Sequence, residues 1–600
     1  MEKNKKVYWD FSCFFDGDDD PKIEENKKIV KQKSYDFINK WKDREDYLKE
    51  PAILQEALED YEEWVSHYGT GGDFAYYFSL RSAQDQNDTE LKAKENRADD
   101  FSQKISNDAR FFGMRIAKIP ESEQKKFLEF EGLKKYKHHL ENSFAEAKYL
   151  LSEKEENILS LESKASFSNW VNMVESFLSK EDSEIITEEG KKEKKNFSEI
   201  LSLTNSKNKE TRDSAGQAFN QILKKHSDVA EHEMNSILQS KKVDDELRGI
   251  ERPDLGRHIS DDVDSEMVDT LIEAVSEKFN VAKDFYELKS KLMGVDKLEY
   301  HERNVPYGEI DKKYSYEDAT NLVLKVFKNL DQKFLEIYEG FIKNGQIDSH
   351  PKKGKSDGAF CAHNLISQPT YILLNHTDRL KDVLTIAHEV GHGINNELMR
   401  EKQNALNFGT PMSTAEVAST FMEDFVLEDI LKEADDELRL TIMMDKLNND
   451  ISTIFRQVAC YKFEQDIHKD FREKGYLSKE EIGKLFQKNM SAYMGDFVEQ
   501  SEGSENWWVY WSHIRRFFYV YSYASGLLIS KSMQNSVKEN PEFIEDVKEF
   551  LSAGVSDSPK NIFKKMGIDI MDKSFWEKGI KEIETLLKET EDLAKKLGKI

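Results

Sequence analysis

The sequence predicts a mainly helical protein with one small β-sheet. Proline, the strongest helix breaker, occurs only 10 times in 600 residues, against an average usage of about 5%. None lies between Pro120 and Pro253. Apolar residues in that stretch recur at helical spacing, beginning with Phe127, Phe130 and Leu133. Both observations favour helices over most of the chain.

One segment, residues 358–375, departs from the helical pattern. The sequences GAFCAHN and PTYILLN frame a loop there, and residues 371–374 are aromatic and β-favouring. We therefore expect two strands joined by a loop, and no other clear strand.

Composition excludes several classes of protein. The chain has 88 Lys and Arg against 115 Asp and Glu, a formal charge of -27, which repels the phosphates of nucleic acids. The longest uncharged apolar stretch, Phe517 to Ser530, is shorter than the roughly 18 residues that a membrane-spanning helix needs. The N-terminus lacks the long apolar stretch and cleavage site of a signal peptide. Three widely spaced cysteines, Cys13, Cys361 and Cys460, fit free thiols in a reducing compartment, so we expect a cytoplasmic protein.

A charged run at residues 190–195, GKKEKK, follows the long helical stretch. We interpret this run as a solvated loop or helix face near a domain boundary. The predicted organisation is an N-terminal helical domain, residues 1–195, and a second domain, residues 196–600.

One motif carries the chemistry. Residues 385–395 read TIAHEVGHGIN and contain His388, Glu389 and His392 in the spacing His-Glu-x-x-His. Histidines four positions apart lie on the same face of a helix, so both imidazoles can bind one zinc ion. Glu389 lies about 100° round the helix from His388, where it can deprotonate a zinc-activated water without binding the metal itself.

A helix around the motif is predicted independently of the histidines. Thr377 or Asp378 can cap its start. Chance alone gives about 0.06 matches to the motif in a chain of this composition. The alternative is a helix with two surface histidines and no metal. The apolar stripe at helical period comprises Leu380, Val383, Leu384, Ala387, Val390 and Ile394.

A catalytic zinc site needs a third protein ligand and an open fourth position. Glu416, 24 residues after His392, is a candidate on a second predicted helix. In the alternative interpretation, Ser413 and Glu416 form a capping box that satisfies backbone N–H groups. Glu423, two turns further on, either orients a ligand histidine as a hydrogen-bond acceptor or faces solvent.

Several blocks in order resemble the oligoendopeptidase F family of zinc metallopeptidases, distant relatives of thimet oligopeptidase. The resemblance is densest from about residue 300 to 585, and a Trp-Asp-Phe-Ser opening at residues 9–12 extends it toward the N-terminus. The matching blocks are GKxxGAFC at 354–361, YILLN at 371–375, HEVGH at 388–392, AEVAST at 415–420, FExxIH at 463–468, HxxxFFYVYxYA at 513–524 and FLSxGxSxSP at 550–559.

The resemblance implies a two-lobed helical zincin-type metallopeptidase, with a small sheet beside the active-site helix and a deep internal channel. It aligns Glu416 with the family's third zinc ligand. It also suggests His513 with Tyr521, or alternatively Tyr519, as donors that stabilise the transition state. Spacing does not choose among Tyr519, Tyr521 and Tyr523.

The predicted function is zinc-dependent endopeptidase activity. His388, His392 and Glu416 bind one Zn²⁺ per chain, and Glu389 acts as general base. Short unstructured peptides are the expected substrates, with no nucleic-acid or membrane partner. A peptide can add its backbone to the edge of strand 371–374, unless that strand is paired on both sides. The alternative functions are a zinc hydrolase of non-peptide acylated amines and a non-catalytic, peptide-binding helical scaffold.

Overall fold

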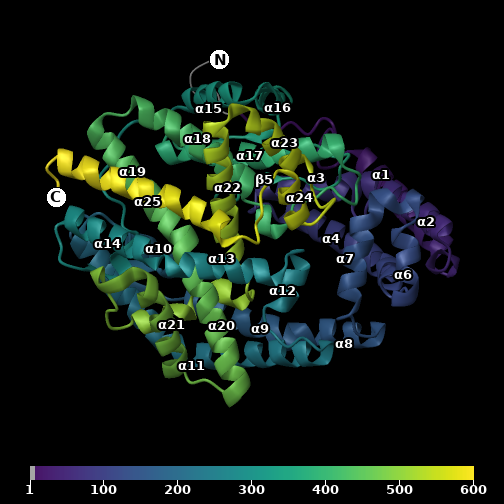
Figure 1. The fold of residues 1–600 in the computed structure, drawn as a ribbon, viewed down its shortest axis with the longest axis horizontal. Helices are drawn as coiled ribbons and strands as arrows, with labels where there is room; N and C mark the ends of the chain where they lie inside the picture. The colour runs from purple at the N-terminus through teal and green to yellow at the C-terminus, as the bar shows by residue number, and fades with distance from the viewer. Residues whose placement is uncertain (1–6) are drawn as a thin grey trace. The chain divides into compact units, whose positions relative to one another are not determined.

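The computed structural model describes residues 7–600. Residues 1–6, which belong to the N-terminus for which no signal peptide is expected, lie outside the described residues. Each of two compact units is assembled from three stretches of chain. Unit 1 comprises residues 1–148, 311–432 and 533–568, and unit 2 comprises 149–310, 433–532 and 569–600. Unit 1 therefore contains purple, green and yellow parts of the ribbon in Figure 1. The domain boundary expected between residues 195 and 196 stays a prediction.

The mainly helical fold is confirmed. Unit 1 begins with seven helices, six of which share a core that includes the buried side chains of Trp41, Trp64 and Phe112. These helices are α1 (Pro21–Trp41), α2 (Pro51–His67), α3 (Gly72–Gln84), α4 (Thr89–Ala109), α5 (Phe111–Ala117), α6 (Glu121–Leu128) and α7 (Lys137–Ala147). The other helices of the unit are α15 (Tyr316–Leu330), α16 (Gln332–Lys343), α17 (Leu380–Lys402), α18 (Val417–Glu433), α23 (Ile544–Ser552) and α24 (Pro559–Lys565).

The predicted strand pair is the core of the unit 1 sheet. β5 (Phe360–Ala362) pairs antiparallel with β6 (Tyr371–Leu373), and β4 (Ile347–Asp348) pairs parallel with the other side of β6. The strand order is β4-β6-β5. Because β6 is paired on both sides, the expectation that its edge is open to a peptide is wrong, and β4 and β5 are the edge strands. The Trp9 indole N–H donates to the Ile372 carbonyl oxygen over 2.9 Å, which ties the N-terminal segment to this sheet.

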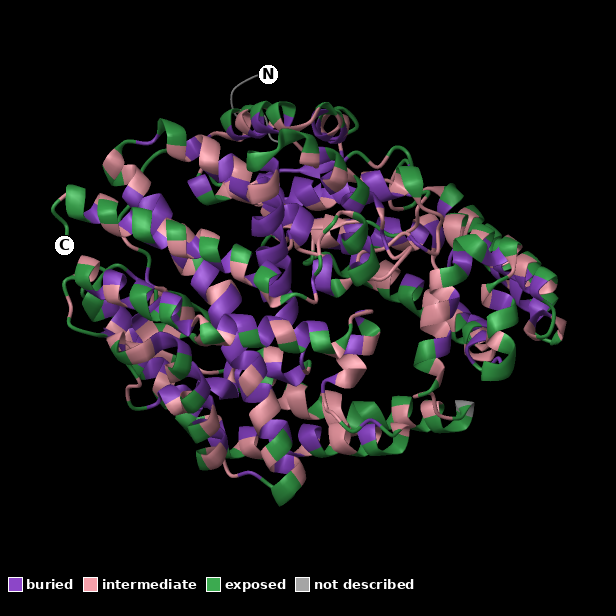
Figure 2. Ribbon diagram, in the orientation of Figure 1, coloured by how far each residue is buried: buried purple, intermediate pink, exposed green. Residues whose placement is uncertain are grey.

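α17 packs beside this sheet and carries the metal-binding motif (Figure 1). Its apolar stripe is buried except for the half-buried Leu384, and buried and exposed residues alternate along most helices (Figure 2). The predicted cap is wrong, because Arg379 is the N-cap residue and its backbone N–H donates to Asp382 Oδ2 over 2.9 Å. The Thr377 hydroxyl instead donates to the Asp382 carboxylate over 3.0 Å. At its far end, α17 is anchored to α23, where the Asn395 amide donates to the Leu551 carbonyl oxygen over 2.6 Å.

Unit 2 is built around the long helix α11 (Lys209–Arg248), which contacts α9, α10, α20 and α21. π-helical segments extend α8 at residues 164–168 and join α19 to α20 at residues 451–455. α22 (Tyr521–Glu539) contributes residues to both units. The remaining helices are α8 (Glu153–Ser163), α9 (Asn169–Ser179), α10 (Phe197–Leu203), α12 (Leu255–Ser260), α13 (Ser265–Glu277), α14 (Phe279–Met293), α19 (Asp436–Asp450), α20 (Arg456–Lys474), α21 (Lys479–Met494) and α25 (Lys573–Lys596).

Unit 2 also contains two pairs of strands that the sequence did not predict. β1 (Asp182–Ile186) and β2 (Lys192–Asn196) form an antiparallel hairpin, and β3 (Leu298–Glu299) pairs parallel with β7 (Val498–Glu499). The interpretation of the charged run as a loop or helix face is therefore wrong for residues 192–195. Glu184 lies opposite Lys194 in the hairpin, and opposite charges across a strand pair stabilise it without an apolar pattern.

None of the helices within residues 7–600 combines the length and apolar character needed to cross a bilayer.

Candidate metal centre and active site

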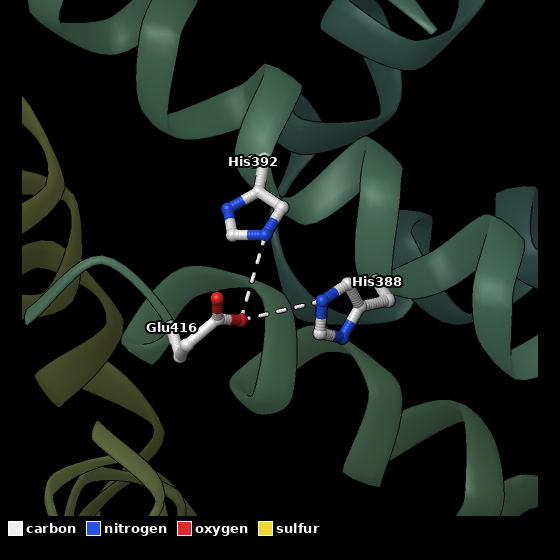
Figure 3. Close-up of side chains that lie close together, drawn as sticks. All are labelled: His388, His392 and Glu416. Carbon is white, nitrogen blue, oxygen red and sulfur yellow. Dashed lines mark ion pairs between the residues drawn. The ribbon is translucent and has the colours of Figure 1, made fainter. Parts of the chain in front are cut away.

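Helix α17 and the turn that leads into α18 bring together the three predicted metal ligands (Figure 3). One carboxylate oxygen of Glu416, Oε2, lies 3.3 Å from His388 Nε2 and 3.5 Å from His392 Nε2. Ligand atoms about 2.0–2.1 Å from a tetrahedral zinc ion stand roughly 3.4 Å apart. The spacing and the N, N, O donor set therefore fit a metal ion bound by these residues.

Glu416 immediately precedes α18, where a capping role was the alternative interpretation. Its Oε2 accepts a hydrogen bond from the Ser419 hydroxyl over 2.9 Å, in addition to facing the two imidazoles. Ser419 thus orients the same oxygen that faces the histidines. This arrangement favours the role of a ligand over that of a cap.

A glycine inside the motif permits the two helices to approach each other. A Cβ atom on Gly391 would lie 2.8 Å from both the Ala418 carbonyl oxygen and the Ser419 Cα, which are backbone atoms of α18. Real Cβ atoms do not approach backbone so closely, so any side chain at this position would push α18 away. Sequence reasoning did not identify Gly391. Its signal is the small residue between two ligands on one helix face.

Glu423 orients the candidate ligand His388 through the ring nitrogen that does not face Glu416. His388 Nδ1 donates to Glu423 Oε2 over 3.1 Å, which fixes the imidazole with Nε2 toward Glu416. A metal-binding histidine commonly donates its other N–H to a carboxylate in this way. Of the two interpretations of Glu423, the structure therefore favours the acceptor over the solvent-facing residue.

The cluster is electrostatically suited to positive charge. Burial alone lowers the pKa of His388, but its hydrogen bonds to Glu416 and Glu423 outweigh burial and raise that pKa to about 10. Burial raises the pKa of Glu416, whereas the two histidines hold it well below its ordinary value. The same attraction that retains a proton on His388 favours a bound cation.

Glu389 lies on α17 between the two histidines and is only 7% exposed. Burial raises the pKa of its carboxyl group, and the charges of His388 and His392 partly oppose that rise. A hydrogen bond from the Cys361 backbone also opposes it and places the base against edge strand β5. A carboxylate with a raised pKa beside metal ligands is suited to accept and release a proton.

The predicted transition-state donors belong to unit 2, and the structure separates them into two groups. His513 Nδ1 is hydrogen-bonded to the Tyr519 hydroxyl, and the Tyr523 hydroxyl donates to Tyr519 over 3.5 Å. Burial lowers the pKa of His513 to about 4, and the positive charges of Arg456 and Arg516 add to this effect. His513 is therefore neutral at pH 7, with one ring nitrogen engaged by Tyr519.

The Tyr521 hydroxyl has a different hydrogen-bond partner from His513 and Tyr519. The Tyr521 side chain is fully buried and its hydroxyl donates to Asp261 Oδ2 over 2.7 Å. A hydroxyl committed to a buried carboxylate is poorly placed to bind a substrate oxygen. Within unit 2, the geometry favours Tyr519 over Tyr521 as the partner of His513.

A second cluster of potential ligands, Asp213, His301 and Glu302, is also in unit 2. Its carboxylates are already paired: Lys209 lies 3.0 Å from Asp213 and 3.1 Å from Glu302, and Arg212 Nε lies 2.8 Å from Glu302. Two cations of the protein occupy the positions that a metal would need, so this cluster is an ion-pair network.

The helical fold and the His-His-Glu cluster with an adjacent buried acid define a metallopeptidase. Residues 202–582 match the family described as peptidase family M3, and residues 115–175 match oligopeptidase F. The first match covers more than half of the chain, so the chain belongs to peptidase family M3. The protein is a metalloendopeptidase with oligopeptidase function, and the resemblance to the oligoendopeptidase F family is confirmed.

Relatives of known name cover most of the chain. The chain is 27% identical over 600 residues to an oligoendopeptidase F homolog of Borreliella burgdorferi, with 98% of each chain covered. It is 26% identical over 539 residues to the oligopeptidase PepF of Bacillus subtilis, covering 87% of this chain and 78% of the relative. The crystal structure of oligoendopeptidase-F from Enterococcus faecium matches 96% of this chain and 99% of its own, with a TM-score of 0.71 and 18% identity.

Proposed function

We propose that the protein is a zinc endopeptidase that cleaves internal bonds of short, unstructured peptides. The observation that carries this proposal is the position of Glu416 Oε2, 3.3 and 3.5 Å from the Nε2 atoms of His388 and His392. Zinc prefers this donor set and this tetrahedral spacing.

His388, His392 and Glu416 would hold the zinc ion, with Glu423 orienting His388. A bound zinc ion supplies a Lewis acid that acidifies water and polarises a carbonyl group. Glu389 accepts a proton from the attacking water and returns it to the leaving amine. Its buried position and raised pKa support both transfers, because a base must also release the proton it takes.

His513 and Tyr519 are proposed to stabilise the negative charge that develops on the carbonyl oxygen. Their mutual hydrogen bond fixes both side chains, and a fixed donor needs no reorganisation when charge develops. When the neutral His513 donates from Nδ1 to the Tyr519 oxygen, the Tyr519 O–H stays free to donate to the carbonyl oxygen. Tyr521 is the weaker candidate, because its hydroxyl is engaged by Asp261.

Edge strand β5 is proposed to align the peptide. Its pairing with β6 leaves one side of β5 outside the three-stranded sheet, and the Cys361 backbone on that strand contacts Glu389. A peptide that extends the sheet at β5 would carry its backbone past the base with little dependence on sequence. The limit to short peptides follows from the family resemblance.

The decisive test is mass spectrometry of products from a mixed pool of short peptides, with and without a chelator. Internal cleavage that is lost with chelator and restored by zinc supports the proposal. Release of only an acyl group from blocked amines would favour the alternative hydrolase. Peptide binding without turnover, in zinc-loaded protein, would favour the non-catalytic scaffold.

We also propose a cytoplasmic location. Cys13, Cys361 and Cys460 are free thiols, of which Cys460 is fully buried. Free thiols persist in a reducing compartment. Cell fractionation with an antibody against the protein tests this proposal.

A further inference from the structure

The segment that joins His513 to Tyr519 contains an unusual backbone turn. Phe517 and Phe518 are consecutive non-glycine residues with φ angles of 47° and 59°. Side chains, bulky ones above all, disfavour this left-handed region. Such a turn persists only where the surrounding structure holds it, and it determines the direction in which the chain enters Tyr519.

One end of this segment is anchored by Arg515. Its guanidinium forms a buried pair with Glu233 of α11, at 3.0 and 2.8 Å, and donates its remaining N–H groups to the carbonyl oxygens of Trp508, Val509 and Trp511. This anchor lies before the left-handed turn and fixes the chain near His513. Another contact is needed to hold the turn itself.

That contact comes from Glu464 on α20. The Phe518 backbone N–H donates to Glu464 Oε2 over 2.7 Å, and Glu464 is fully buried. His468, one turn along the same helix, packs its ring 5.1 Å from that of Phe517 and 4.7 Å from that of Phe518. α20 thus contacts both residues of the turn, through one hydrogen bond and one aromatic ring.

Burying the Glu464 carboxyl group costs free energy, and the group makes a single hydrogen bond in return. Its other oxygen, Oε1, has no hydrogen-bond partner among the described residues. Burial raises the pKa of this carboxyl group to about 8, so the group stays largely neutral at pH 7. An apolar residue of similar size would avoid this cost, which indicates that the contact with Phe518 is the reason for an acid here.

We propose that Glu464 is a positioning residue: its hydrogen bond to the Phe518 N–H holds the left-handed turn and so sets the Tyr519 hydroxyl against His513. The inference rests on the proposed function of the His513–Tyr519 pair. Glu464 acts through the backbone and has no contact with substrate in this role.

The test compares kcat and KM for peptide cleavage in zinc-loaded variants of Glu464. Glu464→Met removes the acceptor, and Glu464→Asp shortens it, so both are expected to lower kcat about 10- to 100-fold with KM little changed. Glu464→Gln keeps an acceptor oxygen and is expected to restore most of the rate. Tyr461→Phe, on the same helix as Glu464, is the matched control, because it removes a buried hydroxyl that donates to Asp254 and leaves the hydrogen bond between Glu464 and Phe518 intact.

A double-mutant cycle with Tyr519→Phe separates positioning from general damage. If Glu464 acts through Tyr519, then Glu464→Asp lowers kcat no further in the Tyr519→Phe background. Multiplicative losses, or unchanged kcat in both Glu464→Met and Glu464→Asp, would overturn the inference while leaving the proposed function intact. An unchanged kcat in Tyr519→Phe alone would instead refute the proposed role of the pair, and the role of Glu464 with it. Thermal unfolding of each variant confirms that the rates compare folded proteins.

Discussion

Replacing Glu423 with alanine should weaken zinc binding without removing a zinc ligand. The Glu423 carboxylate accepts the hydrogen bond from His388 Nδ1 over 3.1 Å. Without it, the imidazole is free to rotate and to adopt the other tautomer, in which Nε2 carries the proton and cannot bind metal. The ligand remains present but is no longer pre-oriented.

The size of the effect follows from the contact. The two side chains are 27% and 26% exposed, so the hydrogen bond is mostly but not wholly shielded from water. A hydrogen bond to a charged group contributes about 1.5–3 kcal/mol, and partial exposure favours the lower half of that range. About 2 kcal/mol corresponds to roughly a 30-fold rise in the dissociation constant for zinc, within the 10- to 100-fold loss typical of such supporting residues.

Competition with a fluorescent zinc chelator at pH 7 measures this constant without reference to catalysis. Glu423→Gln should fall between the wild type and Glu423→Ala, because an amide oxygen still accepts the hydrogen bond without a charge. Glu428→Gln on the same helix is the control, since Glu428 pairs with Lys538 near the surface. An unchanged dissociation constant in Glu423→Ala, or an equal loss in Glu428→Gln, would refute the reasoning.

Four further predictions concern the other residues of the two sites. Glu389→Gln should bind one zinc per chain while peptide cleavage collapses, as measured by metal analysis and product formation. Tyr519→Phe should lower kcat about 10²- to 10³-fold, whereas Tyr521→Phe should cost about 1 kcal/mol of stability with little change in kcat. Gly391→Ala should raise the zinc dissociation constant more than about tenfold, because the added Cβ displaces the helix that carries the third ligand. Glu464 is protonated in the folded state up to about pH 8 but ionises near its ordinary pKa of 4.5 when unfolded, so stability should fall as pH rises through this interval. The steepest loss is about 1.4 kcal/mol per pH unit, and Glu464→Gln should abolish it in chemical denaturation.

Each of these predictions has a distinct contrary outcome. Retained cleavage by Glu389→Gln would exclude Glu389 as the base. A larger loss of kcat in Tyr521→Phe than in Tyr519→Phe would return the donor role to Tyr521. Unaltered zinc affinity in Gly391→Ala would mean that the two helices can separate without moving the ligand. Stability that is flat between pH 4.5 and 8 would show that Glu464 ionises in the folded protein.

The metal-binding helix could be predicted from sequence because its signal is local. The two histidines and Glu389 lie within five residues, and the apolar stripe that buries the helix has the helical period. The strand pair at residues 358–375 was equally accessible, because its β-favouring residues and its loop are contiguous. Such features depend on spacing along one element.

The rest depends on contacts between distant segments. The use of the Tyr521 hydroxyl is decided by Asp261, which lies 260 residues earlier in the chain. The pairing of β6 on both sides is decided by β4, a strand of two residues with no pattern of its own. The second strand of the hairpin, Lys192–Asn196, has no apolar residue, and Lys194 is instead paired with Glu184 and lies 2.9 Å from Asp182. The sequence next to Tyr521, β6 or the hairpin contains no signal that predicts these contacts.

The interleaved order of the two units has a consequence during synthesis. α17 carries the complete metal motif, but the segment that anchors it, around Leu551, is translated about 150 residues later. At roughly 5–20 residues per second, this delay is about 8–30 s. A growing chain on the ribosome therefore exposes its candidate metal-binding sequence well before the rest of unit 1 has been translated. We therefore expect the nascent enzyme to cleave no neighbouring nascent polypeptide until the segment around Leu551 has been translated.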